Sequence, residues 1–308
     1  MNGENKTPTQ FAPNLSKELG VDLFVKRDDL YPMYGGGNKA RKMRSIYQDI
    51  VQCKADVIIT NGGSESNHAR VCALLAATKG MECHLVLHGE KPDTAFCNGN
   101  GFLMEFAGAQ IDYCDANQIA DLIERRRTEY ERAGKGVYVV PGGAHSVQGA
   151  LAYAEAIEEL DFQPDYIVVA SGTGATHAGL HVGAARRFGS ATSVVGISVA
   201  RNRQRGEQVV FESIVELEEF LGISGSTPNL VFRDEWIAGG YGKYSERIIS
   251  AIKFALIQEG LILDPIYTGK AFLGLCDMVM SGEIGPGRSI VFWHTGGQLN
   301  LQSTARFQ

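Results

Sequence analysis

The amino-acid sequence predicts an α/β protein whose parallel sheets are flanked by helices on both faces. Short runs of β-branched and apolar residues alternate with longer amphipathic stretches along the 308 residues, and several short runs are almost continuously apolar. Strands that are buried on both faces of a parallel sheet have this composition. Glycine-rich segments follow the strands at 62–63, 142–143, 172–174 and 296–297. Because ligands bind beyond the carboxyl ends of strands in open α/β sheets, we expect these segments to surround one site.

The predicted strands and helices alternate through most of the chain. The strands are expected at 22–28, 57–63, 83–89, 109–115, 137–143, 166–172, 194–199 and 289–297. The helices are expected at 42–53, 67–80, 118–133, 145–160, 177–188, 245–259 and 269–281. The length and the pattern fit two α/β lobes.

Composition argues against several classes of partner. Hydrophobic residues make up 44% of the chain, charged residues 21%, and the net charge is −6. This balance is typical of a globular protein and disfavours binding to nucleic acid or to an anionic membrane. The N-terminal segment MNGENKTPTQ lacks the apolar core of a signal peptide, and no apolar run has the ~18 residues of a membrane span. The cysteines form no Cys-x-x-Cys pair, so free thiols in the cytoplasm are expected at Cys53, Cys72, Cys83, Cys97, Cys114 and Cys276.

The segment VVASGTGATHAGL predicts an anion site. An apolar strand runs into Ser171-Gly-Thr-Gly-Ala-Thr176, and a helix follows. Backbone amides and the helix dipole favour an anion at such a position. His177 replaces the last glycine of a dinucleotide-binding loop, and no Gly-Lys-Ser/Thr closes a Walker loop. The hydroxyl groups suit a compact phosphate monoester instead.

A second glycine loop, TNGGSESNHAR, also runs into a helix start. Ser64, Ser66 and Asn67 can cap this helix or donate hydrogen bonds to a ligand carboxylate. His68 and Cys72 have the i, i+4 spacing of metal ligands. No third ligand accompanies them in the sequence, so we expect packing rather than a metal site.

Lys39 follows three glycines in YGGGNKARK, at the start of a predicted helix. Most lysines in this position are exposed. Burial or a neighbouring cation lowers the pKa of a lysine amine and makes it a nucleophile toward aldehydes, and Arg41 and Lys42 are nearby cations. Together with a phosphate loop, such a lysine predicts a cofactor that has both an aldehyde and a phosphate, which is pyridoxal 5′-phosphate (PLP).

Seven segments in order carry a family resemblance. They are TPTQFAPNLSKELGVDLFVKRDDLYP, GGGNKARK, NGGSESNHAR, SGTGATHAGL, GGYGKYSE, DPIYTGKAF and HTGG. With them the chain resembles fold-type II PLP enzymes, in particular the D-cysteine desulfhydrase and 1-aminocyclopropane-1-carboxylate (ACC) deaminase group. The resemblance implies a fold like the tryptophan synthase β-subunit, with parallel or mixed twisted sheets. It also implies a homodimer, a large domain of residues 1–41 and 149–308, and a small mobile domain of residues 42–148.

The same resemblance implies a role for each site residue. Lys39 would bond covalently to the cofactor and then move the Cα proton, while Asn67 would contact the cofactor's phenolic oxygen. Thr268 would meet the pyridine nitrogen. The residues expected to hold the phosphate are Gly172, Thr173, Gly174, Ala175 and Thr176. The residues expected to face the substrate are Ser64, Glu65, Ser66, His68, Tyr241 and Tyr267.

Thr268 favours one reaction within this group. ACC deaminases resemble the chain but have glutamate at this position, where a carboxylate keeps the ring nitrogen protonated for opening a cyclopropane. A neutral threonine favours α,β-elimination from a small amino acid, giving a 2-oxo acid and ammonia, as in D-cysteine desulfhydrases. A β-replacement synthase that makes a specialised amino acid and an ACC deaminase remain alternatives.

Three segments depart from the family pattern. Ser64 and Glu65 replace an apolar residue and a neutral amide. Glu65 would repel an anionic substituent on the substrate if it faced the site, or it points to solvent. Tyr244 stands where a small residue is usual, and the tail QLNLQSTARFQ also differs. These departures concern the identity of the substrate rather than the cofactor.

Overall fold

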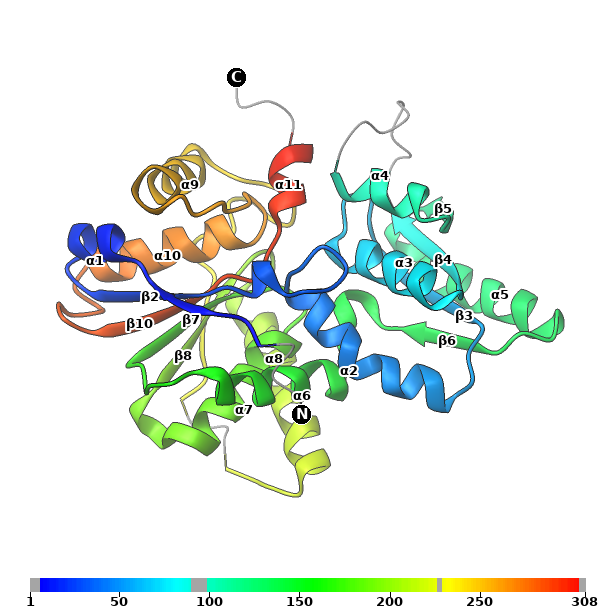
Figure 1. The fold of residues 1–308 in the computed structure, drawn as a ribbon, viewed down its shortest axis with the longest axis horizontal. Helices are drawn as coiled ribbons and strands as arrows, with labels where there is room; N and C mark the ends of the chain where they lie inside the picture. Colours follow the sequence, from blue (N-terminus) through cyan, green and yellow to red (C-terminus); the bar gives the residue numbers. More distant parts are fainter. Residues whose placement is uncertain (1–5, 90–98, 226–228, 305–308) are drawn as a thin grey trace.

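The structure is a computed structural model that describes residues 6–89, 99–225 and 229–304. The chain forms two α/β lobes side by side, each built on its own sheet (Figure 1). The larger sheet has the order β1-β2-β10-β7-β8-β9, and the smaller has the order β5-β4-β3-β6. Only the β1–β2 pair is antiparallel among the described strands. The predicted fold class is thereby confirmed.

The strands and helices have the following bounds. The larger sheet contains β1 (Thr9–Phe11), β2 (Asp22–Lys26), β7 (Tyr166–Ser171), β8 (Ser193–Ser198), β9 (Val231–Arg233) and β10 (Ser289–Trp293). The smaller contains β3 (Val57–Gly63), β4 (Glu82–His88), β5 (Gln110–Cys114) and β6 (Val137–Val140). The helices are α1 (Pro13–Leu19), α2 (Asn38–Gln52), α3 (Asn67–Lys79), α4 (Gly99–Phe106), α5 (Ile119–Arg132), α6 (Val147–Ala156), α7 (Ala175–Phe188), α8 (Arg203–Leu221), α9 (Glu246–Glu259), α10 (Thr268–Met280) and α11 (Gln298–Ser303).

The larger sheet is buried on both faces, as its apolar strands predict. Along β7, Val168 packs into a core with α1, α9 and α10, while its neighbour Ile167 packs into a second core with α6 and α7. Successive side chains of a strand point to opposite faces, so a strand between two helical layers must be apolar throughout. The helices α1, α9 and α10 cover one face and α6, α7 and α8 lie on the other (Figure 1).

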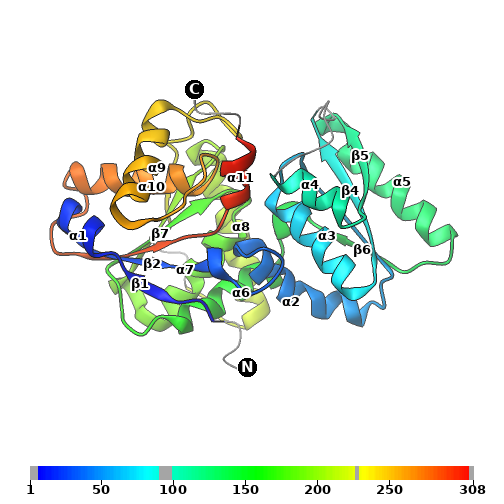
Figure 2. The ribbon, with the colours of Figure 1, turned by 45° about the horizontal axis from the view of Figure 1, so that its top comes forward.

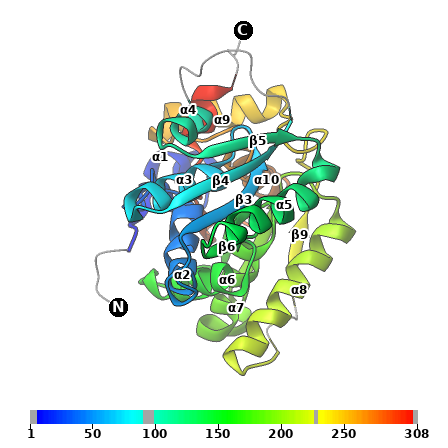
Figure 3. The same ribbon diagram turned by 90° about the vertical axis from the view of Figure 1, so that its right-hand side faces the viewer.

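The smaller sheet is enclosed in a similar way. Met43 and Ile46 of α2 share a core with α3 and with alternate residues of β3 and β4. Figure 3 faces this sheet and shows its strands in the order β5, β4, β3, β6, with α5 in front. All four strands lie between residues 57 and 140, inside the range 42–148 expected for the small domain. Helix α2 begins at Asn38 and runs without a break across the expected boundary at residue 42, and the mobility of this lobe stays a prediction.

None of the helices among the described residues has the length and apolar character needed to cross a membrane. The described cysteines, which exclude Cys97 because it lies outside these ranges, are all free. The described residues also contain no group of three or more potential metal ligands. His68 and Cys72 contact each other in the core, with the thiol sulfur 3.7 Å from Nε2.

Candidate active site

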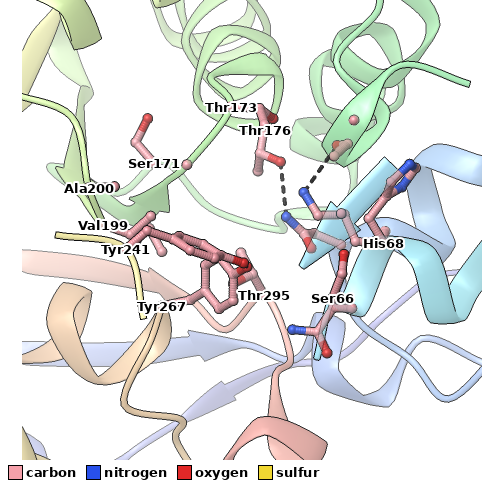
Figure 4. Close-up of a pocket in the computed structure, with 18 of the residues that line it drawn as sticks. Ser66, His68, Ser171, Thr173, Thr176, Val199, Ala200, Tyr241, Tyr267 and Thr295 are labelled. Carbon is pink, nitrogen blue, oxygen red and sulfur yellow. Dashed lines mark hydrogen bonds between the residues drawn. The ribbon is translucent and has the colours of Figure 1, made fainter. Parts of the chain in front are cut away.

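The predicted glycine segments meet at one cavity of about 490 Å³ between the two lobes. Figure 4 shows its walls, to which both sheets contribute. The glycines that line it are Gly62, Gly63, Gly142, Gly143, Gly172, Gly174, Gly296 and Gly297. The expectation that these segments surround one site is confirmed.

Two glycine loops pack backbone against backbone where α2 begins. Gly37 has a φ of +89°, and a Cβ there would lie 2.9 Å from the carbonyl oxygen of Thr295. A Cβ on Gly296 would lie 2.8 Å from the Cα of Gly37. The amide of Asn38 donates to the same Thr295 carbonyl at 2.9 Å. Only glycine fits this crossing, which fixes the first turn of α2 against the end of β10.

Lys39 extends from that first turn into the cavity, where its Nζ lies 3.1 Å from the carbonyl oxygen of Gly143. Desolvation lowers the pKa of Lys39 to about 8. The sequence suggested that Arg41 and Lys42 would have this effect, but burial of the amine is the main cause. An appreciable fraction of the amine is therefore neutral near pH 7 to 8, as a nucleophile requires.

Arg41 points away from the cavity and anchors α2. Its guanidinium pairs with Asp28 at 2.7 Å and with Glu159 at 2.5 Å. The carboxylate of Asp28 also accepts hydrogen bonds from the Tyr153 hydroxyl at 2.6 Å and the Trp293 indole at 2.9 Å. This buried network joins the turn after β2, α6 and β10 to the helix that presents Lys39. Each charge in it has a partner, as buried charges require.

The loop between β7 and α7 has the features of an anion site. Gly172, Thr173, Gly174 and Thr176 line the cavity at the N-terminus of α7. The hydroxyl of Ser171 is buried and has no hydrogen-bond partner among the described residues. A buried hydroxyl without a partner is costly, so it is suited to a polar ligand. Ala175, which was also expected to hold the phosphate, is fully buried, and it is not among the residues that line the cavity. It is the first residue of α7, so its backbone amide belongs to the first turn of that helix.

Tyr241 and Tyr267 form the opposite wall. Their hydroxyl groups hydrogen-bond to each other, and their rings meet edge to face with centroids 6.0 Å apart. Desolvation raises the pKa of Tyr267 well above its usual value, and that of Tyr241 is raised for the same reason. Both phenols are therefore protonated at neutral pH, and the hydroxyl that accepts in their mutual hydrogen bond keeps its own hydrogen to donate to a ligand.

Thr268 lies elsewhere than the resemblance implies. It does not line the cavity, and its hydroxyl donates to Asp264 at 2.7 Å. The threonine that does line the cavity is Thr295, in the HTGG segment. The structure therefore favours Thr295 over Thr268 for direct contact with a ligand.

The second glycine loop divides into two parts. Ser66 and Asn67 line the cavity, and the Ser66 hydroxyl accepts the amide of Ala69 at 3.2 Å as the cap of α3. Ser64 and Glu65 do not line it. The Glu65 carboxylate instead accepts the backbone amides of Asn100 at 2.8 Å and Gly101 at 3.3 Å. Glu65 thus neither faces the substrate nor points to solvent, and it caps α4.

His68 lines the cavity as a neutral imidazole. Burial lowers its pKa well below the usual value. Its Nε2 lies 2.8 Å from the Thr60 hydroxyl, which itself donates to the carbonyl of Val140 at 2.7 Å. Because Thr60 has only one hydrogen, Nε2 of His68 is the donor in this contact.

Several polar residues of the cavity were not predicted from the sequence. These are Asn38, Asn61, His88, Arg201 and, as a ligand contact, Thr295. Asn61 precedes the first pair of glycines and Arg201 follows β8, so both stand near the end of a strand. Position at a strand end was therefore a usable signal that we applied only to the glycines.

Comparisons with known proteins agree with this site. Residues 1–296 match the family described as "Pyridoxal-phosphate dependent enzyme". A protein of Pyrococcus horikoshii, named "Putative 1-aminocyclopropane-1-carboxylate deaminase", is 38% identical over 299 residues, which cover 95% of this chain and 89% of that protein. A D-cysteine desulfhydrase of Klebsiella pneumoniae is 35% identical over 304 residues, which cover 94% of this chain and 91% of that protein.

A solved structure described as an ACC deaminase homologue has a TM-score of 0.88 and 37% identity, and the match covers 96% of this chain and 90% of that one. Two α/β lobes with a lysine and a glycine-rich loop at the cavity between them are the features of a fold-type II PLP enzyme. The chain belongs to the family of pyridoxal-phosphate dependent enzymes.

The residues of the cavity fit this cofactor. The partly neutral amine of Lys39 suits an aldehyde. The unpartnered Ser171 hydroxyl at the end of β7 and the nearby N-terminus of α7 suit a phosphate. Lys42 is buried next to this region, and burial together with the charge of Lys39 lowers the pKa of its amine well below the usual value. An anion bound nearby would favour the protonated form of this amine.

Proposed function

We propose that this protein is a PLP-dependent lyase that releases ammonia and a 2-oxo acid from a small amino acid by α,β-elimination, as the name of its D-cysteine desulfhydrase relatives suggests. The observation that carries the proposal is the chemistry of the cavity wall. Among the described residues that line it, none is an aspartate or a glutamate. No carboxylate of these residues can keep the pyridine nitrogen protonated, and elimination of a good leaving group needs a weaker electron sink than opening a cyclopropane does.

The charge of the cavity supports the same substrate class. Lys39 and Arg201 are the lysine and arginine that line it, and the Glu65 carboxylate is turned into the cap of α4. A cationic cavity favours the carboxylate of an amino acid and a leaving group that departs as an anion, such as a thiolate. Repulsion between Glu65 and an anionic substituent of the substrate is therefore not expected, because the Glu65 carboxylate binds the amides of α4.

The residues of the chain have separate tasks in this reaction. When bound, PLP draws electrons from the Cα of an amino acid and so acidifies its Cα–H bond. Lys39 then takes the Cα proton, for which its pKa of about 8 is well matched to neutral pH. Ser66 and the N-terminus of α3 hold the substrate carboxylate. The hydroxyl pair of Tyr241 and Tyr267 faces the substrate and can donate a proton to the leaving group.

The overall reaction with cysteine is balanced by one water molecule. The Cα–H and Cβ–S bonds break, and hydrolysis replaces the C–N bond by a carbonyl. One molecule of cysteine and one of water thus give pyruvate, ammonia and hydrogen sulfide.

The experiment is a screen of the purified, PLP-loaded protein against D-cysteine, L-cysteine, ACC, serine and 2,3-diaminopropionate. We expect pyruvate and ammonia, with sulfide from a cysteine. Production of 2-oxobutyrate from ACC alone would show an ACC deaminase, the activity that the name of the Pyrococcus relative suggests. If added thiols or amines lower the yield of pyruvate and a new amino acid forms instead, the reaction is β-replacement. No product from any of the five would reject the lyase.

Lys39→Ala tests the assignment of the nucleophile. We expect turnover to be abolished because the residue is both the covalent anchor and the base. Lys54→Ala is the matched control, because Lys54 follows the same helix and is exposed. Equal activity of Lys39→Ala and the control would overturn the assignment.

We also propose a homodimer in the cytoplasm. The family resemblance supports the dimer, and the free cysteines fit a reducing compartment. Light scattering coupled to gel filtration tests the dimer, and a chain of 33.4 kDa that elutes only as a monomer would reject it.

A further inference from the structure

The side-chain amide of Asn67 is held in a single orientation by three neighbours. Its Oδ1 accepts hydrogen bonds from Arg70 Nη1 at 3.3 Å and from Asn100 Nδ2 at 3.0 Å. Its Nδ2 donates to Oδ1 of Asn300. Because a guanidinium can only donate, the contact with Arg70 fixes which end of the amide is the oxygen.

Asn300 is oriented just as firmly. Its Nδ2 donates to the backbone carbonyl oxygen of Glu65 at 2.8 Å, and a carbonyl can only accept. The opposite end of its amide, Oδ1, must therefore face Asn67. Asn300 lies in α11, is only 1% exposed, and belongs to the tail that departs from the family pattern.

One N–H of the Asn67 side chain is left to face the cavity. The NH₂ group has two hydrogens, and the contact with Asn300 takes one of them. Asn67 lines the cavity, so the second N–H is the group that it offers to a ligand. The direction of that N–H depends on the acceptor that holds the first.

We propose that Asn300 is a positioning residue that aims the free N–H of Asn67 at the phenolic oxygen of the cofactor. The inference rests on the proposed function and on the contact with the phenolic oxygen that the family resemblance implies for Asn67. Asn300 acts from the larger lobe on a loop of the smaller one, so it also couples the relative position of the two lobes to the geometry of the site.

A second group of contacts reinforces this connection. Helix α11 lies against α4 of the smaller lobe (Figure 2). At their closest approach, a Cβ built on Gly99 would lie 2.7 Å from Cβ of Ser303 and 2.6 Å from Oε2 of Glu65. The side chain of Ser303 also hydrogen-bonds to Glu65. Asn300 and Ser303, one turn apart on α11, therefore both contact Glu65. Asn300 binds its backbone carbonyl and Ser303 binds its carboxylate.

The test compares Asn300→Ala and Asn300→Asp with the wild-type protein, and Gln302→Ala serves as the control because Gln302 is exposed on the same helix. The measurements are the dissociation constant of PLP, the absorption spectrum of the bound cofactor, and hydrogen–deuterium exchange of residues 64–70 in the cofactor-free protein. We expect Asn300→Ala to weaken PLP binding about tenfold, the effect of one hydrogen bond to a buried group, and to speed exchange in the loop. Asn300→Asp keeps an acceptor for Asn67, and in its protonated form it also keeps a donor for the Glu65 carbonyl, so it should weaken binding less than Asn300→Ala at acidic pH.

A double-mutant cycle separates positioning from general stabilisation. Since Asn300 acts through Asn67, the Asn300→Ala change should alter PLP affinity much less in an Asn67→Ala protein than in the wild type. Equal losses of affinity in both backgrounds, or unchanged affinity and spectrum in Asn300→Ala, would overturn the proposal. These measurements need no substrate, so they give a result even if the screen for lyase activity finds none.

Discussion

The ammonium group of Lys270 lies 2.9 Å from the carbonyl oxygen of Gly240, the residue immediately before Tyr241. The same nitrogen donates to the carbonyls of Val199 at 2.8 Å and Ile237 at 2.9 Å. Lys270 is fully buried, and desolvation lowers its pKa to about 8. One cation thus ties the end of β8 to the loop that presents Tyr241.

Lys270→Met should loosen that loop, since methionine fills much of the space but leaves three carbonyls without a donor. We expect kcat/KM on the substrate found by the screen to fall about tenfold or more, and hydrogen–deuterium exchange in residues 237–242 to accelerate. Lys253→Met is the control, because Lys253 is exposed on α9. Exchange in 237–242 at the wild-type rate would contradict this role for Lys270.

Thr295→Val and Thr268→Val should behave differently. Thr295 lines the cavity, so its loss should alter PLP affinity or the cofactor spectrum. Thr268 donates to buried Asp264, so its loss should lower the free energy of unfolding by about 1–3 kcal/mol and leave the spectrum unchanged. Urea denaturation and absorption spectroscopy measure the two effects. If only Thr268→Val changed the spectrum, the result would favour the contact between Thr268 and the pyridine nitrogen that the family resemblance implies.

The amine of Lys39 should react with a small acylating reagent at an unusually low pH. Its pKa of about 8 means that the neutral, reactive fraction rises most steeply around pH 8, rather than near the ordinary lysine value of about 10.4. Acetic anhydride labelling of the cofactor-free protein, followed by mass spectrometry, gives this profile. Nα-acetyl-lysine in the same tube is the control, and coincident profiles would contradict the lowered pKa.

The network around Asp28 should make the protein sensitive to acid. Ion pairing and hydrogen bonds hold the pKa values of Asp28 and Glu159 below their usual values of 3.8 and 4.5. A carboxyl with a lowered pKa in the folded state adds stability above its unfolded pKa, and this contribution is lost as the pH falls through the folded pKa. The free energy of unfolding should therefore drop steeply below about pH 4.

Asp28→Asn tests the same network at neutral pH. It leaves the buried Arg41 short of one partner, which typically costs about 3–5 kcal/mol of unfolding free energy. It should also flatten the acid limb of the pH profile. Asp161→Asn is the control, because Asp161 is exposed. Equal stability of the two variants would show that the pair with Asp28 does not hold α2 in place.

The sequence predicted the fold class and most of the strands. The central strands, such as β3, β4, β7 and β8, carry their own signal, because burial on two faces requires an apolar run. The three-residue edge strands β1 and β9 were missed, since so short a run shows no period. Helix α8 was also missed, although Asn202 caps it and Val210, Ile214 and Leu217 recur at helical spacing. That signal was present in the sequence.

The chemistry of the site was less predictable than its location. Motifs placed Lys39 and the glycine loop of residues 172–176 at the cavity, because the role predicted for each depends on the adjacent backbone. The orientation of the Glu65 side chain could not be predicted from the neighbouring sequence, since its carboxylate accepts the backbone amide of Asn100, which is 35 residues away. Asn300 was missed for the same reason, because its partner Asn67 is 233 residues away.

The close crossing of the loops at Gly37 and Gly296 has a practical consequence for redesign. Any side chain larger than hydrogen at either residue would push the start of α2 away from β10 and carry Lys39 with it. Libraries intended to change which amino acid is accepted should therefore leave both glycines untouched. Asn61 and His88 are better places for variation, because they line the cavity and lie on β3 and β4 rather than on the helix that carries Lys39.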